Sequence, residues 1–317
     1  MKDKSSAIPG PAVARSGLVL AFLGVLTFSF TIIASVYALR GLDPYLIGIG
    51  RAAAVTVPAA LALAAARAPR PRGAEWPALL VAGAGVVFGF PVLSTLALDH
   101  GASASHSAVV IGLLPAATAV LAVLRAGERP SRAFWAAAAA GAVCVTGFAL
   151  LRGAGRLSAA DLLLLGALLA AAAGYAEGGR VARARPGWQV ISWALVLSAP
   201  ITLPVTAWLL ATTSPHWTPQ ATAGFAYVAL MSAFLGFFAW YEGLARAGIA
   251  RASQVQLTQP PLTLAWSALL LGEHVDLLTG AAALAVLGCV AAAQRARVGA
   301  APAPVPAVSP GRSARAA

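Results

Sequence analysis

Three glutamines and two prolines interrupt an apolar stretch that is about long enough to cross a bilayer. Gln254, Gln256 and Gln259 come first, and Pro260 and Pro261 follow directly. Proline has no backbone N–H and its ring clashes with the carbonyl four residues earlier, so two carbonyls here should lose their usual helix partners. In hydrocarbon, such groups are tolerated only where they face protein or a water-filled cavity. The stretch therefore predicts a polar cavity at membrane depth, beside the proline break.

The glutamine side chains are the first candidates for contact with a polar solute. Gln256 and Gln259 share one helix face at i, i+3 spacing, beside the carbonyls of Gln256 and Leu257 that the prolines should free. Their amides offer donors and acceptors without charge, which suits a neutral or zwitterionic solute. The alternative is that these side chains make interhelical hydrogen bonds that only hold a bundle together. The sequence leaves both uses open, with Gln254 the weaker candidate for binding.

Charged residues inside apolar stretches are the second group of candidates. Arg51 lies about two helical turns inside such a stretch, where a buried cation is expensive and marks a functional site by default. Snorkelling to the nearby interface is its ordinary explanation. Glu242 could exchange a coupling proton if burial favours its protonated form, but it also stands four residues from Arg246, and we favour the ion pair. Its neighbours Trp240 and Tyr241 join the glutamines as candidate substrate contacts.

The other acidic residues inside or beside apolar stretches have structural explanations. Glu177 precedes an arginine at i+3 spacing, which predicts another ion pair. Asp161 follows Ser158 at capping-box spacing and indicates the start of a helix. Glu128 and Glu273 each end an apolar stretch, and we interpret both as structural.

One motif resembles an enzyme site. Gly101-Ala102-Ser103-Ala104 is similar to the serine motif of rhomboid intramembrane proteases, whose nucleophile needs a histidine base from a later span. The later histidines fall in loops, and His106 is only three residues from Ser103. The sequence also has no paired acidic metal motif and no Walker motif. We therefore expect no enzyme, no metal and no cofactor.

Composition assigns the chain to the lipid bilayer. Of its 317 residues, 60% are apolar and 10% are charged, and the mean hydropathy is +0.82. A soluble protein of this size would carry many more charges. The formal charge of +12 would suggest nucleic acid as the partner of a soluble protein. Here the arginines stand in short connections between apolar stretches, as topology signals do, so no nucleic-acid partner is expected.

Ten stretches of about 20 mainly apolar residues predict ten membrane-spanning helices. They lie at residues 17–39, 44–66, 77–98, 103–124, 133–151, 160–179, 189–211, 221–241, 252–271 and 277–294. When the connections are counted alternately, eighteen of the 22 Lys and Arg residues fall on one side, and only Arg40, Arg152 and Arg156 on the other. Cytoplasmic loops carry the excess of Lys and Arg. Both termini are therefore expected in the cytoplasm, residues 1–16 and 299–317 as tails, the second of them disordered.

The chain repeats itself at a distance of 145 residues. The shift places Pro115 on Pro260, and Gly127 and Glu128 on Gly272 and Glu273. Two halves of five helices follow, residues 17–152 and 160–295. Because five is odd, the halves face opposite ways across the membrane, as an inverted repeat. Proline-interrupted segments at matching positions of two such halves point to the binding site of a transporter.

The same shift relates two stripes of small residues. Ala136, Ala140 and Cys144 in the fifth range superimpose on Ala281, Ala285 and Cys289 in the tenth. Small residues four apart let helix backbones approach closely in lipid. We expect the stripes to pack against one another or against a second protomer, as in a homodimer.

Two segments carry a resemblance to a known family, A-L-D-H-G-A-S-A-S-H-S-A-V-V-I-G-L-L-P-A-A-T-A-V-L-A-V-L-R-A-G-E-R from Ala97 and G-L-A-R-A-G-I-A-R-A-S-Q-V-Q-L-T-Q-P-P-L-T-L-A-W-S-A-L-L-L-G-E from Gly243. Each has a small-residue turn, a span with a central proline and a closing Gly-Glu. Over both halves, the chain resembles EamA-type members of the drug/metabolite transporter superfamily. The resemblance implies an all-α carrier of ten helices, with a central cavity formed by the first four helices of each half and helices five and ten to one side.

The resemblance also affects individual residues. An arginine is common in the family at the position of Arg51, which favours a structural or gating role for it, together with Pro115, Pro260, Pro261 and Glu242. The three glutamines and the second proline depart from the family pattern, in which apolar residues are more usual. The substrate therefore cannot be transferred by resemblance.

The predicted function is secondary transport of a small neutral or zwitterionic organic solute, such as an amino acid, metabolite or drug. We expect outward transport across the cell (cytoplasmic) membrane by alternating access. A carrier or exchanger of anionic sugar-phosphate or nucleotide-sugar solutes is the alternative. Such polyanions require several deep cations, and Arg51 alone qualifies in the sequence.

Overall fold

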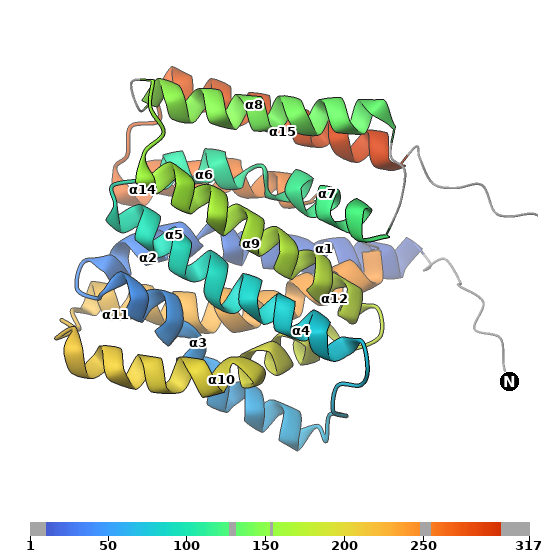
Figure 1. The fold of residues 1–317 in the computed structure, drawn as a ribbon, viewed down its shortest axis with the longest axis vertical. Coiled ribbons are helices and arrows are strands. Elements are labelled where there is room, and N and C mark those ends of the chain that lie inside the picture. The colour runs from blue at the N-terminus through green and yellow to red at the C-terminus, as the bar shows by residue number, and fades with distance from the viewer. Residues whose placement is uncertain (1–10, 127–130, 153–154, 248–254, 299–317) are drawn as a thin grey trace, which may run out of the picture.

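The protein is a bundle of helices that run side by side in stacked layers, as the computed structural model shows (Figure 1). The structure describes residues 11–126, 131–152, 155–247 and 255–298, and these contain no strand. Helices lie in all ten of the expected ranges. Within the described ranges, eight helical stretches are long and apolar enough to cross a membrane, and Leu277–Ala293 is a shorter apolar helix. The chain is therefore a multi-pass membrane protein.

The helices of the first half are continuous in some ranges and interrupted in others. They are α1 (Pro11–Ser29), α2 (Thr31–Leu39), α3 (Pro44–Ala65), α4 (Glu75–Gly83), the π-helical segment η1 (Ala84–Gly89), α5 (Phe90–Asp99), α6 (Ala104–Ile111), α7 (Leu114–Ala126) and α8 (Arg132–Arg152). In the second half the helices are α9 (Ala159–Ala182), α10 (Gly187–Thr212), α11 (Pro219–Ala226), the π-helical η2 (Tyr227–Leu235), α12 (Gly236–Ala247), the 3₁₀ turn η3 (Gln256–Thr258), α14 (Gln259–Leu271) and α15 (Leu277–Val298).

Side-chain caps start several helices at one end of the bundle, where α2 meets α3, α5 meets α6 and α8 meets α9 (Figure 1). Asp43 accepts hydrogen bonds from the first turn of α3, Ser103 from α6, Ser158 from α9 and Thr218 from α11. These oxygens satisfy backbone N–H groups that a helix start leaves free. We call this the capped end of the bundle.

Contacts between the two halves dominate the packing. Helix α1 packs against α12, α3 against α10, α6 against α14, and α9 against α4, η1 and α5. Helices α8 and α15 pack against each other at one edge of the bundle (Figure 1), which is the position that the family resemblance implied for helices five and ten.

Glycine allows a close approach of two backbones between α1 and α12. A Cβ atom at Gly243 would lie 2.5 Å from the backbone nitrogen of Ala21, and one at Gly17 would lie 2.5 Å from that of Ala247. Both distances are far shorter than any carbon–nitrogen contact without a bond. The two backbones therefore touch, and any side chain at Gly17 or Gly243 would push them apart.

Only part of the two small-residue stripes lies between helices. Cys144 and Cys289 are half-buried, and a Cβ at Gly141, about one helical turn before Cys144, would lie 3.4 Å from the Cβ of Cys289, so this part of the stripes lies between α8 and α15. The four alanines, Ala136, Ala140, Ala281 and Ala285, are exposed on the bundle surface. The prediction that these alanines pack against one another is therefore wrong. That they pack against a second protomer stays a prediction.

Two π-helical segments were not predicted. Residues 84–89 form η1 and residues 227–235 form η2, and the 145-residue shift brings the first onto the second. A π-helix places one extra residue in a turn and is frequently found at functional sites. Here both segments supply residues that line the central cavity, Val86 from η1 and Ser232 from η2.

Candidate substrate site

Two small hollows adjoin one another inside the bundle, between helices of both halves. The first is lined by Gly112, Pro115, Gln256, Gln259 and Pro260 among others. The second is lined by Thr31, Arg51, Tyr175, Ser232 and Phe237 among others. Because Phe28, Phe90, Leu114 and Gln259 line both, the two form one central cavity.

The central cavity is closed in this structure. Its two hollows have volumes of about 10 and about 20 Å³, which is room for about one water molecule each. Pockets that enclose an organic ligand usually have volumes of about 300 Å³ or more. The surrounding helices must therefore move apart before an organic solute can bind there.

The proline break of the second half lies in the cavity wall. Pro260 and Pro261 stand in the first turn of α14, where a missing N–H does no harm, and η3 precedes them. The backbone N–H of Gln259 donates to the carbonyl of Gln256. The expectation that this carbonyl lacks a protein partner is therefore wrong, because the narrower 3₁₀ turn supplies one three residues on.

The first half has a break at the matching place. Helix α6 ends at Ile111 and α7 begins at Leu114, so Pro115 stands in the first turn of α7. A Cβ at Gly112 would lie 3.1 Å from the Cγ of Pro260. The two breaks thus meet at the first hollow.

The structure brings Gln256 and Gln259 to this hollow. Gln256 is 3% exposed, and neither its Nε2 nor the Oε1 of Gln259 has a hydrogen-bond partner within the described residues. Buried polar groups are normally hydrogen-bonded, so both amides keep bonding capacity for a solute. Ile111 and Leu114 also line the hollow and supply apolar surface. Gln254 lies outside the described residues.

Arg51 extends into the cavity and not to the membrane interface. It is 2% exposed, so the snorkelling explanation is wrong. Its Nη2 donates to Ser232 Oγ at 3.4 Å, and that oxygen lies 2.8 Å from Thr31 Oγ1. Its Nη1 has no partner among the residues that the structure describes. Arg51 therefore connects α2, α3 and η2 beside the cavity and keeps one donor free.

Aromatic rings form much of the second hollow. The ring centroids of Phe28 and Phe237 are 4.9 Å apart, and Tyr175 lies 6.4 Å from the first and 6.0 Å from the second. Trp240 packs behind this cluster, 6.0 Å from Tyr175, and the fully buried Tyr241 packs against Phe237. Neither Trp240 nor Tyr241 lines the cavity. The aromatic residues placed at the cavity are instead Phe28, Phe90, Tyr175 and Phe237, which sequence reasoning missed.

The acidic residues of the spans are engaged in pairs away from the cavity. Arg246 Nε donates to Glu242 Oε1 at 2.8 Å, and Arg180 Nε donates to Glu177 Oε2 at 3.0 Å. Both predicted ion pairs are confirmed. Glu242 has a partner in Arg246 and does not line the cavity.

An open recess of about 460 Å³ lies at the capped end. We call it the vestibule; its lining includes His100, Ser103, His106, Arg152, Asp161, Glu273 and His274. At its rim Arg152 pairs with Asp276 at 2.5 Å. The backbone N–H of Thr279 and the side chains of Thr279 and Arg152 hold the pKa of the Asp276 carboxyl below its usual value, because all of them favour the charged form.

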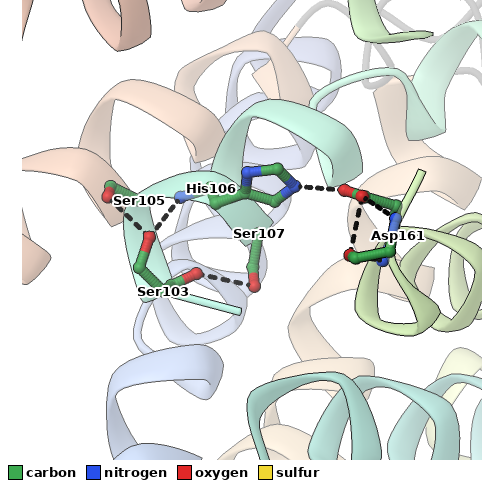
Figure 2. A network of polar contacts seen from close by, with 6 residues as sticks. Ser103, Ser105, His106, Ser107 and Asp161 are labelled. Carbon is green, nitrogen blue, oxygen red and sulfur yellow. Dashed lines mark hydrogen bonds and ion pairs between the residues drawn. The ribbon is translucent and has the colours of Figure 1, made fainter. Parts of the chain in front are cut away.

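Two contacts tie helices of both halves together at the floor of the vestibule. His106 Nε2 on α6 lies 2.7 Å from Asp161 Oδ1 on α9, and Asp161 also completes the predicted capping box with Ser158 (Figure 2). The two carboxylate oxygens of Glu273, just after α14, accept the backbone N–H groups of Ala104 and Ser105 at 2.8 Å each. Sequence reasoning assigned structural roles to Asp161 and Glu273 but did not find these partners.

The vestibule contacts exclude the arrangement that a serine protease needs. Ser103 Oγ accepts the backbone N–H of His106 and lies 3.1 Å from Ser105 Oγ, while the His106 ring points to Asp161 (Figure 2). The hydroxyl and the imidazole therefore do not form a nucleophile and base pair.

Comparisons with known proteins agree with this architecture. The model of the EamA-like transporter family matches residues 15–151 and residues 158–293, one match in each half. The chain belongs to the EamA-like transporter family. It is 44% identical over 283 residues to the uncharacterized transporter YdeK of Bacillus subtilis (strain 168), which covers 88% of this chain and 97% of the relative.

Other relatives of this EamA-family protein are more distant. A probable terminal-alkyne amino-acid exporter of Streptantibioticus cattleyicolor is 28% identical over 242 residues, with 74% of this chain and 79% of that protein covered. A protein of known crystal structure matches with a TM-score of 0.61 at 18% identity, over 90% of this chain and 98% of the other. The last comparison shows a shared fold alone.

Proposed function

We propose that this EamA-family protein is a secondary carrier that exports a small neutral or zwitterionic organic solute across the cytoplasmic membrane by alternating access. The observation that carries the proposal is the closed central cavity at the two helix breaks, where Gln256, Gln259 and Arg51 keep unused hydrogen-bonding groups. Polar groups of this kind are costly in a membrane and are kept where a substrate path needs them. The relative from Streptantibioticus cattleyicolor, named as a probable terminal-alkyne amino-acid exporter, supports a solute of the same class.

The contacts between helices support ten spans in two inverted repeats. Each of the first five predicted spans can be exchanged with the span five places later in the chain. This exchange leaves the pairs α3 with α10, α6 with α14 and α8 with α15 unchanged. The same exchange turns the pair α1 with α12 into the pair α9 with α4 and α5. A two-fold relation between halves produces this pattern, and a cavity on such an axis can open to either side by rocking one half against the other.

Charge argues against the alternative of a sugar-phosphate or nucleotide-sugar carrier. Within the described residues, Arg51 is the one cation that lines the central cavity. A phosphate ester carries up to two negative charges, and desolvating them against a single cation is unfavourable. A solute with one negative charge or none matches the cavity better.

The direct test of the proposal compares cells with and without the protein. We expect at least one amphipathic amino acid or similar solute to accumulate inside cells that lack it, and to fall when the protein is restored. The Gln256→Leu variant at equal membrane abundance is the control for nonspecific effects of expression. Unchanged metabolite profiles in all three strains, inside the cells and in the medium, would refute the proposed function.

Loss of either cavity glutamine is expected to weaken transport. Gln256→Leu and Gln259→Leu each remove an amide atom that has no hydrogen-bond partner within the described residues, Nε2 of Gln256 and Oε1 of Gln259, so their cost should appear in transport more than in folding. We expect a loss of about 0.5–2 kcal/mol per hydrogen bond to the solute, measured as initial efflux rate at matched membrane abundance. Gln254→Leu is expected to do less.

Gln189 provides a matched control for these variants. It is a buried glutamine at the start of α10, and it does not line the central cavity. Gln189→Leu should therefore leave the efflux rate near that of the parent. If Gln256→Leu and Gln259→Leu transport as well as Gln189→Leu, the glutamines only hold the bundle together.

The proposed orientation makes a separate prediction. A reporter enzyme fused after Ala317 should be active in the cytoplasm, because eighteen of the 22 Lys and Arg residues fall on the side of the termini. A cysteine at Pro215, between α10 and α11, should react with an impermeant maleimide from outside, in a background in which Cys144 and Cys289 are alanine. Reaction of this cysteine from the cytoplasmic side alone would overturn the ten-span topology.

A further inference from the structure

The most unusual group in the bundle is the guanidinium of Arg51. It is always charged in proteins, and it stands 2% exposed in the middle of apolar and aromatic side chains. Its Nη1 has no hydrogen-bond partner within the described residues, and its Nη2 has only the long bond to Ser232. Burying a cation whose donors are unused costs free energy unless an anion pairs with it.

The described part of the chain supplies no such anion. Arg51 forms no ion pair there, and no aspartate or glutamate lines either hollow of the cavity. The carboxylates of Glu75, Glu242 and Asp276 are taken by arginines elsewhere in the bundle. The second hollow, into which Arg51 opens, is therefore a cavity with one unneutralised positive charge.

We propose that Arg51 binds the carboxylate of the transported solute, which makes the solute an amphipathic molecule with a single carboxylate. The inference rests on the proposed carrier function and names the chemistry of its substrate. A planar guanidinium matches a carboxylate through two parallel hydrogen bonds. A second negative charge would have no cation to meet it, since Arg51 is the one cation that lines the cavity within the described residues.

The neighbours of Arg51 complete a site for such a molecule. Ser232 and Thr31 place two hydroxyl groups next to the guanidinium; one donates to the other, and the remaining O–H can donate to a carboxylate oxygen. Gln259 lines the same hollow, and its amide oxygen without a partner can accept a hydrogen bond from the ammonium group of a zwitterion. The rings of Phe28, Tyr175 and Phe237 surround the space left for an apolar body, and their faces also attract an ammonium group.

The path of the backbone supports a binding role over a purely structural one. Ser232 reaches Arg51 from η2, a π-helical segment, and Thr31 starts α2 just after the helix break at Phe30. A buried hydrogen-bond network that only held helices together would satisfy all its members, because an unpaired buried polar group is costly. Here two local departures from α-helix surround a guanidinium that still has a free donor.

The test compares a carboxylate with its neutral amide in the full-length protein. Purified parent, Arg51→Gln and Arg51→Lys proteins are reconstituted into vesicles, and counterflow is measured with L-leucine and L-phenylalanine against L-leucinamide and L-phenylalaninamide. We expect the parent to prefer each amino acid to its amide. Arg51→Gln should lower apparent affinity for the amino acids by about thirtyfold or more, with less than about a threefold change for the amides. Arg51→Lys should restore part of the difference, because it restores the charge without the bidentate geometry.

Two results would overturn the inference. If the parent exchanges the amides as well as the acids, or better, Arg51 does not bind a carboxylate. If Arg51→Gln lowers thermal stability and reduces exchange of acids and amides alike, its role is structural. Failure of the proposed function itself is distinct, since it would appear as unchanged metabolite profiles in whole cells and no counterflow of any solute.

Discussion

Gly243→Ala is expected to destabilise the protein by about 2–3 kcal/mol, although alanine is the better helix former. The new methyl group would lie 2.5 Å from the backbone nitrogen of Ala21 and 2.8 Å from its Cα. Both are backbone atoms of α1, so no side chain can rotate away, and α1 and α12 must separate along their contact. The measurement is the apparent melting temperature of the purified protein in detergent, which should fall by several degrees.

Gly147 on α8 is the matched control. It is also a helical glycine in a membrane-spanning helix, but a Cβ there would meet nothing within 4 Å. Gly147→Ala should therefore leave the melting temperature unchanged or raise it slightly, because alanine restricts the unfolded chain more than glycine does. Equal melting temperatures for the two variants would show that α1 and α12 are not in backbone contact.

The contact at Gly243 illustrates what the sequence cannot predict. Gly17 and Ala21, and Gly243 and Ala247, are small residues four apart, but alanine and glycine are so frequent in this chain that many other pairs match the same pattern. The stripe chosen from the repeat, Ala140 and Ala285 among others, turns out to be exposed. Which small residues face another helix depends on how the helices are rotated in the bundle, and that is set by all their contacts together.

The positions of the helices could be predicted from the sequence, because hydropathy and loop charge are properties of whole segments of about 20 residues. The interruptions of these helices were only partly predictable. Proline marks the breaks at Pro115 and Pro260. The π-helical segments η1 and η2 have no such residue to mark them, because one extra residue in a turn is a response to packing.

The sequence predicts those residues of the candidate site whose polar or charged side chains cost free energy at membrane depth. Gln256, Gln259 and Arg51 are polar or charged at membrane depth, and the structure places all three at the central cavity. The sequence indicates Trp240 and Tyr241 only as neighbours of Glu242, and aromatic residues are common throughout an apolar bundle. Their neighbour Phe237 lines the cavity, and sequence position alone does not distinguish it from them.

The vestibule shows how the cavity is closed at the capped end. Moving inward along α6, His106 lines the vestibule and Ala108 lines the central cavity. The start of α6 therefore separates the two spaces. Glu273 holds this helix start to α14, and His106 holds it to α9. Opening the cavity toward the vestibule requires that α6 leave at least one of these partners.

Glu273→Ala is therefore expected to open the cavity toward the vestibule more often. Its carboxylate satisfies two of the N–H groups that the start of α6 leaves free, at 2.8 Å each. Losing both bonds should favour the open form by about 1–3 kcal/mol, which is a change of roughly 5-fold to 150-fold in the ratio of open to closed forms. The readout is the maleimide labelling rate of Ala108→Cys, a position 3% exposed in the closed cavity, with Cys144 and Cys289 replaced by alanine.

Asp276→Ala is the control that separates opening of the cavity from a general loss of charge in the same loop. Asp276 is also an acid beside a helix start, accepting the N–H of Thr279, but its partners are on α8 and α15 and none is on α6. The ion pair of Asp276 with Arg152 is exposed, so little stability depends on it. In the Asp276→Ala variant, the labelling rate of Ala108→Cys should therefore stay within about twofold of the rate in the parent. Because the two carboxylate hydrogen bonds of Glu273 act on the start of α6 and not on the contact between α1 and α12, Glu273→Ala should speed labelling without lowering the melting temperature as much as Gly243→Ala does. If Glu273→Ala and Asp276→Ala label at the same rate, Glu273 only ends α14, and the barrier between vestibule and cavity lies in the packing of α6 itself.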